Sequence, residues 1–217
     1  GKFQLALDNF LKAYNLALEK ENIEDQREIS LAIAAIRNIN GQHYAAADLY
    51  KRSLNLLKQK SSSTEGYYDD YATLFYNLSL TYLRLSQLDT SKYYVQKGIE
   101  LARLEQKKED FKDFVLVDAQ INFYKRDFKR AKDTLLKYIN DFKGTSKAIK
   151  LYYLGKIEKH NGNDKVATAY FKTIDSIVSS TEDPFDEVKD VYQQLIISSI
   201  LEDDEKEQID YIEKLIY

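Results

Sequence analysis

The sequence predicts an all-α protein made of consecutive antiparallel helical hairpins. Its 217 residues include one proline and seven scattered glycines, so little interrupts long helices. Apolar residues recur at intervals of three and four, as in Leu74, Leu78, Tyr82 and Leu85, which places one apolar stripe on each helix. Short turn sequences recur every 36 to 45 residues and divide the chain into pairs of such helices, about eleven in all. Each helix must then cover its stripe with a neighbour.

Composition excludes several classes of protein. A formal net charge of -3 and a hydrophobic content of 44% are typical of a folded domain or compact array. The absence of cysteine excludes a disulfide scaffold, a thiolate metal site and a cysteine nucleophile. No window approaches the 18 consecutive apolar residues of a membrane span. Because the chain has neither a methionine nor a leader sequence at Gly1, we expect it to be a segment of a longer protein.

The turns set a common register for the second helix of each hairpin. The predicted turns are Asn40-Gly41, Ser86-Gln87, Arg126-Asp127, Asn161-Gly162 and Asp203-Asp204. We count from one residue of each turn, namely Gly41, Ser86, Arg126, Gly162 and Asp203, and from Gly1. Five residues onward a small residue recurs with one exception: Ala6, Ala46, Ser91, Ala131, Ala167 and Gln208. One helical turn further on lies a large apolar residue: Phe10, Tyr50, Val95, Leu135, Phe171 and Ile212. We expect the small residue to let two helices approach closely and the large one to fill the adjoining space.

The first helix of each hairpin has a matching register. Seven residues before the same turn residues lie Ala34, Ser79, Ala119, Gly155 and Ile196, which are mostly small, as expected where two helix axes cross closely. The residue before each is apolar in Ile33, Leu78, Leu154 and Leu195, and Asp118 is the exception.

This register divides the chain into repeats within one continuous domain. Residues 1–22 are expected to be the second helix of a truncated repeat, followed by complete repeats at 25–60, 67–107, 109–142, 145–180 and 184–217. Ser61 to Thr64, together with Gly66, predict a loop between two repeats.

The spacing resembles that of the tetratricopeptide repeat. The best matches to its signature are Leu154-Gly155, Ala167 and Phe171, and Leu78-Ser79 with Tyr82. The resemblance implies a right-handed superhelix, an α-solenoid whose first helices line a concave groove that binds a peptide or protein. By this resemblance the groove residues are Leu31, Ala35, Leu80 and a more polar set: Tyr76, Asn77, Gln120, Tyr124, Tyr153, Lys156 and His160.

Other kinds of site are poorly supported. No facing acid and base, nucleophile and base, or glycine-rich phosphate loop can be assembled, so we expect no enzyme and no cofactor. His43 and His160 lack a second ligand at helical spacing, and the acidic run 202–205 lies at a predicted turn, so no metal site is predicted. The basic clusters around Arg126 and Lys147 are interpreted as solvated helix faces rather than a nucleic-acid surface.

Two further expectations concern the aromatic and polar residues of the groove. In the adjacent pairs Tyr67-Tyr68 and Tyr152-Tyr153, only one member is expected to face inward. A clamp for the carboxylate of a chaperone tail would need Asn77 flanked by basic and amide residues on the neighbouring helices. The residues at the flanking positions are Leu31, Ala35, Asp113 and Val117, which disfavours such a clamp.

A closer resemblance concerns three stretches, 151–157, 170–177 and 210–217. They resemble the tetratricopeptide sensor region of bacterial AraC-type helix-turn-helix transcriptional regulators. This resemblance implies a periplasmic sensory array that binds a partner and signals to a downstream DNA-binding domain, which these residues lack. The alternatives are a cytoplasmic location and a free-standing scaffold or assembly adaptor. We also expect self-association through exposed apolar residues of the first and last helices, among them Ile212, Leu215 and Ile216.

Overall fold

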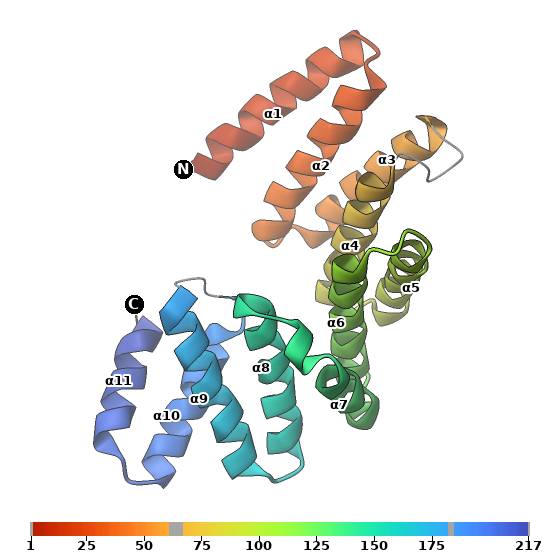
Figure 1. The fold of residues 1–217 in the computed structure, drawn as a ribbon. Helices are drawn as coiled ribbons and strands as arrows, with labels where there is room; N and C mark the ends of the chain where they lie inside the picture. The colour runs from red at the N-terminus through yellow and green to blue at the C-terminus, as the bar shows by residue number, and fades with distance from the viewer. Residues whose placement is uncertain (1, 61–66, 182–184, 217) are drawn as a thin grey trace. The chain divides into compact units, whose positions relative to one another are not determined.

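The computed structural model describes residues 2–60, 67–181 and 185–216, which form helices and turns without any strand (Figure 1). The predicted all-α class is therefore confirmed, with eleven α-helices within the described residues. They are α1 (Lys2–Glu19), α2 (Ile23–Ile39), α3 (His43–Lys60), α4 (Tyr68–Arg84), α5 (Leu88–Leu104), α6 (Lys108–Tyr124), α7 (Phe128–Lys137), α8 (Gly144–His160), α9 (Asp164–Thr181), α10 (Val188–Leu201) and α11 (Glu205–Ile216). A short 3₁₀ turn, Ile139–Asp141, follows α7. The loop predicted at 61–64 lies outside the described residues.

The chain divides into two compact units, residues 1–121 and 122–217, with the boundary near the end of α6. In unit 1, each helix from α1 to α5 packs against the next one along the chain. In unit 2, the same nearest-neighbour packing joins α7 through α11. Such packing is how helical hairpins hide apolar stripes that no single hairpin can bury. The division of the chain into individual repeats stays a prediction.

All five predicted turns contain a residue in the left-handed backbone region. The φ angles are 74° at Gly41, 58° at Ser86, 61° at Arg126, 77° at Gly162 and 59° at Asp203. The next amide then donates back to a carbonyl five residues earlier, as from Gln87 to Tyr82 and from Asp127 to Asn122, each at 2.9 Å. This bond pattern ends a helix within one residue and lets the next begin at once. Glu21 and Gln106 make two more such turns.

The predicted register of small and large residues is confirmed in the interior of both units. The small positions Ala46, Ser91, Ala131 and Ala167, and the large positions Tyr50, Val95, Leu135 and Phe171, are all buried. The register fails to predict burial on α1 and α11, where Phe10 and Ile212 are exposed. Each of these helices packs mainly against one other helix of the described chain, α2 and α10 respectively, so part of its apolar stripe stays uncovered.

Small residues bring paired helices into close contact. The Ser91 hydroxyl on α5 donates to the Ser79 carbonyl on α4 at 2.7 Å, and both residues are buried. A Cβ atom added at Gly155 on α8 would lie 2.6 Å from the Phe171 ring on α9. Gly98 on α5 leaves even less room beneath the Phe114 ring on α6, and the register did not predict this contact.

The expectation for the tyrosine pair on α8 is wrong, because Tyr152 and Tyr153 are both buried. Tyr152 lies against Phe185, with ring centroids 6.4 Å apart, and Tyr153 lies against Phe123 at 5.1 Å. The expectation assumed that α8 buries only one face. Because α8 has aromatic partners on more than one side, both tyrosines are covered. In the pair at the start of α4, Tyr68 is buried and Tyr67 is partly buried.

Candidate functional site

A pocket between α4 and α6 is the candidate site of unit 1. Its volume is about 170 Å³, comparable to an engineered protein cavity that holds one benzene molecule. Its lining residues are Asp69, Ala72, Thr73 and Tyr76 from α4, and Asp110, Asp113 and Phe114 from α6. The α4 residues recur at intervals of three and four, as do the α6 residues, so each helix contributes one face.

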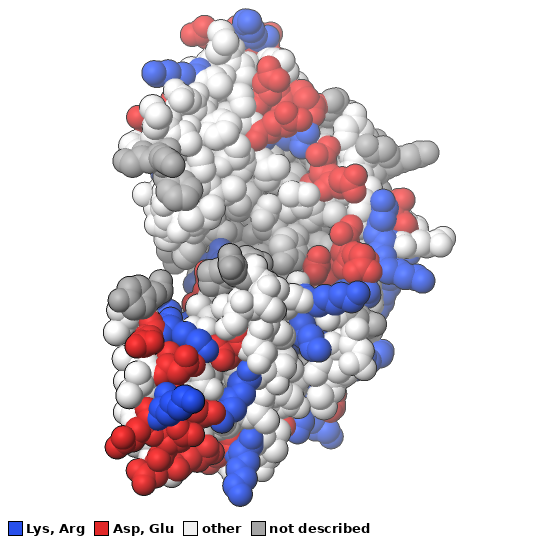
Figure 2. Space-filling view, turned by 60° about the vertical axis from the view of Figure 1, so that its left-hand side comes forward, with Lys and Arg blue, Asp and Glu red and all other residues white. Residues whose placement is uncertain are grey.

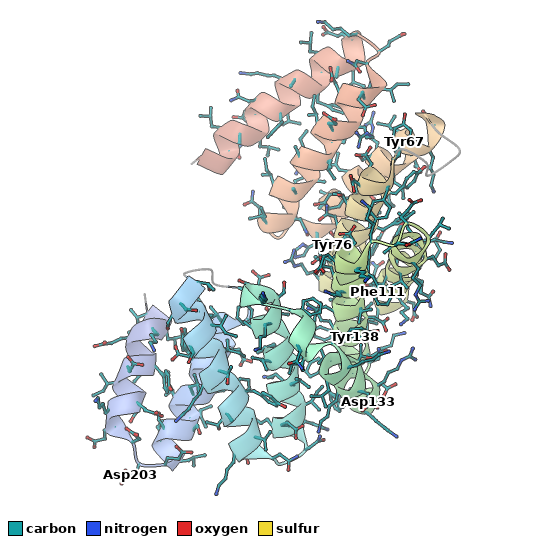
Figure 3. The ribbon with its side chains drawn as sticks, in the orientation of Figure 1. Tyr67, Tyr76, Phe111, Asp133, Tyr138 and Asp203 are labelled. Carbon is teal, nitrogen blue, oxygen red and sulfur yellow. The ribbon has the colours of Figure 1, made fainter. Side chains whose placement is uncertain are left out.

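The inner wall of the pocket is aromatic and firmly held. The Tyr76 and Phe114 rings meet edge to face, with centroids 5.9 Å apart and planes at 80°. Phe114 is 1% exposed, and its ring occupies the space above Gly98 where a side chain would otherwise lie. Figure 3 shows Tyr76 on α4, with Phe111 on the neighbouring α6. The wall is therefore a packed surface that a ligand would find already formed.

Three aspartates surround this wall. The Tyr68 hydroxyl on α4 donates to Asp110 Oδ2 on α6 at 2.5 Å, which ties together the two helices that form the pocket. Burial and this hydrogen bond raise the pKa of the Tyr68 hydroxyl, so it remains a donor at neutral pH. Burial, followed by the charge of Asp113, also raises the pKa of Tyr76. Lys107 is a cation close to this hydrogen bond, with Nζ 5.0 Å from the Tyr68 ring centroid.

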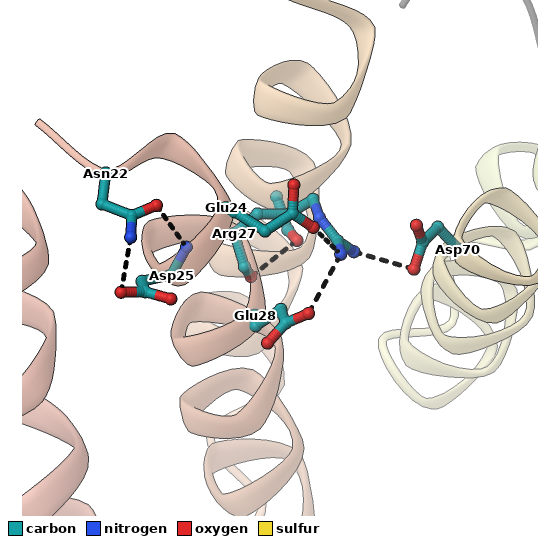
Figure 4. Close-up of polar contacts among 7 residues, drawn as sticks. Asn22, Glu24, Asp25, Arg27, Glu28 and Asp70 are labelled. Carbon is teal, nitrogen blue, oxygen red and sulfur yellow. Dashed lines mark hydrogen bonds and ion pairs between the residues drawn. The ribbon is translucent and has the colours of Figure 1, made fainter. Parts of the chain in front are cut away.

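The cationic side chain of Arg27, which lies between α2 and α4, is already paired with carboxylates (Figure 4). Arg27 on α2 is 4% exposed and pairs with Asp70 on α4 at 2.9 Å, with Glu24 at 2.6 Å and with Glu28 at 3.4 Å. Its backbone carbonyl accepts a hydrogen bond from Ser53 on α3 at 3.0 Å. Removing one partner from such a network leaves a buried charge, so Arg27 is best described as a structural tie.

In unit 2, two of the predicted groove residues connect α8 to α10. The Tyr153 hydroxyl donates to Glu187 at 3.2 Å, and Lys156 Nζ donates to Asp190 Oδ2 at 2.9 Å. The Tyr152 hydroxyl donates to the same Asp190 oxygen at 2.8 Å. Burial opposes ionisation of Asp190, but these donors outweigh it and lower its pKa. The carboxylate therefore stays charged and holds the two helices together.

The structure brings the seven predicted groove residues together only in part. In unit 1, Tyr76 lines the pocket, Asn77 is partly buried and Gln120 is buried. In unit 2, Tyr124 is 52% exposed and packs edge to face against Tyr153. His160 is exposed beside Phe128, with ring centroids 4.4 Å apart, at the end of α8. Sequence reasoning did not predict the three pocket aspartates as site residues, although clusters of acids early in α4 and α6 were the available signal.

The described residues were also searched for other kinds of site. Over the described ranges, no three or more histidine, aspartate or glutamate side chains are grouped so that they could hold a metal ion. Among the described helices, none is both long and apolar enough to cross a bilayer. Acidic side chains form several contiguous groups on the face shown in Figure 2, with basic side chains among them.

Comparisons with known proteins establish the fold. Neither a family model nor a curated protein sequence matches the chain. Among solved structures, NprR in complex with its cognate peptide NprX aligns with a TM-score of 0.75 and 17% identity, covering 98% of this chain and 60% of that one. The apo form of the quorum sensor NprR from B. thuringiensis aligns with a TM-score of 0.74 and 16% identity, covering 98% and 58%.

Two other structures align over nearly the whole chain. BtubC from P. vanneervenii gives a TM-score of 0.71 at 14% identity, covering 99% of this chain and 90% of that one. Apo RapI gives 0.70 at 14% identity, covering 99% and 58%. The chain thus has a tetratricopeptide-like helical repeat fold and spans about three fifths of NprR and RapI. Nothing in these comparisons supports the AraC-type resemblance.

Proposed function

We propose that this chain is a recognition module, without catalysis of its own, that binds a peptide on the face formed by the first helices α4 and α6 of unit 1. The observation that carries the proposal is the pocket between α4 and α6, which combines a fixed aromatic wall with polar groups. In ligand sites an apolar wall provides affinity and a few polar groups fix orientation, and this pocket has both elements on a small scale. The likeness to NprR, whose structure includes a cognate peptide, supports a peptide as the ligand class.

A sensory role within a larger regulator extends this proposal. Peptide binding that favours one arrangement of neighbouring helices would shift the population of that arrangement and so alter an attached output domain. The chain spans 60% of NprR, so what NprR does as a whole protein comes to this chain only as a proposal. An AraC-type DNA-binding output remains a hypothesis based on the sequence resemblance alone. A free-standing scaffold or assembly adaptor is the alternative.

Selection from a random peptide library tests the proposal. We expect a displayed library of heptapeptides, panned against the immobilised chain at physiological salt, to yield specific binders. Substituting Tyr76→Ala should weaken their binding at least about tenfold, because truncating a central aromatic anchor typically has an effect of this size. Tyr44→Ala is the matched control, since Tyr44 lies on α3 and is exposed. Failure to select any binder, or equal loss in both variants, would contradict binding at this face.

Self-association stays a separate prediction. The described part of α11 exposes Ile209, Ile212 and Ile216, and α1 exposes Leu5 and Leu16. Apolar helix faces of this kind promote association in water.

A further inference from the structure

We infer that the pocket between α4 and α6 selects a peptide ligand by accepting the cationic side chain of a lysine or arginine. The inference rests on the proposed function and names the chemistry of the residue that the pocket would take. Three features of the pocket carry it: its charge, its aromatic wall and its size.

The described lining residues carry negative charge alone. Asp69, Asp110 and Asp113 supply three carboxylates, and the remaining four lining residues are neutral. Carboxylates that line one pocket attract a ligand cation and disfavour a ligand anion. The Tyr68 hydroxyl bonds one oxygen of Asp110, which fixes the orientation of this carboxylate relative to the pocket. A ligand cation would then form charge-assisted hydrogen bonds to a site that is partly preorganised.

The aromatic wall favours an organic cation with an alkyl stem. Tyr76 and Phe114 present ring surface and edge beside the carboxylates, and Ala72 adds a small apolar contact. A lysine or arginine side chain has the matching pattern, because its methylene groups bury against apolar surface while its charged end stays among polar groups. Its charge is also attracted to aromatic faces. An anionic side chain would meet three like charges in the same place.

The size of the pocket fits one side chain rather than a folded element. A volume of about 170 Å³ accommodates a ligand of a few heavy atoms. The pocket therefore provides one specificity position, and contacts elsewhere on the first-helix face would have to provide the rest of the affinity.

Peptide pools that differ at a single position test the inference. The probes are acetylated heptapeptide pools with random flanking residues and a central lysine, arginine, norleucine or glutamate, captured on the immobilised chain and counted by mass spectrometry. Acetylation ensures that the fixed side chain, and not the peptide amino terminus, is the cation that distinguishes the pools. We expect the lysine and arginine pools to be enriched at least about fivefold over norleucine, and the enrichment to fall as ionic strength rises.

Substitutions at the pocket test whether the cationic side chain of the peptide binds there. Asp69→Asn and Asp113→Asn should each reduce the enrichment severalfold, whereas Asp48→Asn makes the same charge change on α3 and should leave it unchanged. Thr73→Lys places a resident ammonium on an exposed lining position and should abolish the enrichment by occupying the pocket. Because Thr73→Lys removes no carboxylate, it tests the inference even if an aspartate variant fails to fold.

A small-molecule probe separates this inference from the proposed function. n-Butylammonium should shift the NMR signals of the Tyr76 and Phe114 rings, while uncharged n-butanol at the same concentration should not. If all pools bind equally, the inference is overturned while peptide recognition stands. If n-butylammonium binds at Tyr76 but no pool is captured, the cation preference of the pocket stands and peptide recognition is overturned. If neither probe binds, both are overturned.

Discussion

At the scale of single residues, one register position performs the same task in three repeats. The acidic residue lies nine positions before Ser79, Ala119 or Ile196, the residues that share one register position on the first helices, and it accepts a hydrogen bond from the preceding first helix. The pairs are Arg27 with Asp70, Tyr68 with Asp110, and Tyr153 with Glu187. The donor is an arginine in one pair and a tyrosine in the other two, whereas the acceptor is a carboxylate in all three. The position of the carboxylate in the register is therefore what these three hydrogen bonds share. Asp110 is the member of this set that also lines the pocket.

The turn residues predict a stabilising substitution. Arg126 has a φ of 61° and an exposed side chain, and a non-glycine residue in this region is strained. Arg126→Gly should therefore raise the free energy of unfolding by about 0.5–1 kcal/mol, because glycine adopts this conformation without a Cβ clash. Lys129→Gly, on the exposed surface of α7, should lower it by a similar amount. Urea unfolding measures both, and a loss of stability in Arg126→Gly would count against the strain argument.

The lowered pKa of Glu158 predicts how the free energy of unfolding depends on pH. Its side chain is 4% exposed and pairs with Lys132 Nζ at 2.5 Å, and Asn163 donates to it at 2.7 Å. These two hydrogen bonds outweigh burial and hold the pKa of Glu158 below its usual range. A carboxyl whose pKa is lowered by folding stabilises the fold above its unfolded pKa, about 4.3, and loses that contribution as pH falls through the folded value.

Glu158→Gln should thus cost about 1–3 kcal/mol at pH 7 and progressively less below about pH 4. The measurement is urea unfolding of both proteins across this range. A difference between them that stays constant with pH would contradict the assignment.

At the scale of helices, two neighbouring helices pack closely where a glycine on one leaves room for an aromatic ring of the other. Gly98 and Phe114 join α5 to α6, as Gly155 and Phe171 join α8 to α9. The first of these contacts also supports the pocket, because the Phe114 ring forms its wall. A change on α5 can therefore alter a site formed by α4 and α6.

Gly98→Ala should destabilise the protein even though alanine favours helix. The gain of up to about 1 kcal/mol in helix propensity is smaller than the expected overpacking cost of about 1–3 kcal/mol against a buried ring. Phe114→Leu in the same chain should recover part of the loss, giving a coupling energy of about 1 kcal/mol or more in a double-mutant cycle. Chemical denaturation of the four proteins measures it, and strictly additive effects would show that the two residues do not compete for space.

At the scale of the whole molecule, stability is organised by neighbouring helices within two compact units. Arrays of this kind behave as a sum of local stabilities and nearest-neighbour interfaces, so damage in one place need not spread. The candidate pocket lies in unit 1, while the bonds between α8 and α10 lie in unit 2.

Leu154→Ala tests this organisation. Leu154 on α8 is fully buried, so truncation should destabilise its surroundings by about 2–5 kcal/mol. We expect faster amide hydrogen exchange throughout α8 and α9, with α2 and α4 little changed. A uniform increase across all helices would instead indicate one cooperative unit. Leu201→Ala, an exposed position at the end of α10, serves as the control.

The sequence by itself determined the elements and much of the interior of this protein. Helix stripes, turn residues such as Gly41 and Gly162, and the small positions Ala46 and Ala167 are local signals, and each is satisfied within a turn or a hairpin. Local propensity and periodicity suffice where a residue's partner is fixed by its distance along the chain.

Tertiary structure alone decided which side chains converge between successive first helices. Asp69 and Asp110 are forty-one residues apart in the sequence, and they line one pocket only because α4 and α6 lie side by side. The same applies to Tyr152 and Tyr153, both of which are buried because partners reach α8 from different sides. Periodicity specifies which face of a helix is apolar, whereas the number of neighbours covering that helix depends on packing between distant segments.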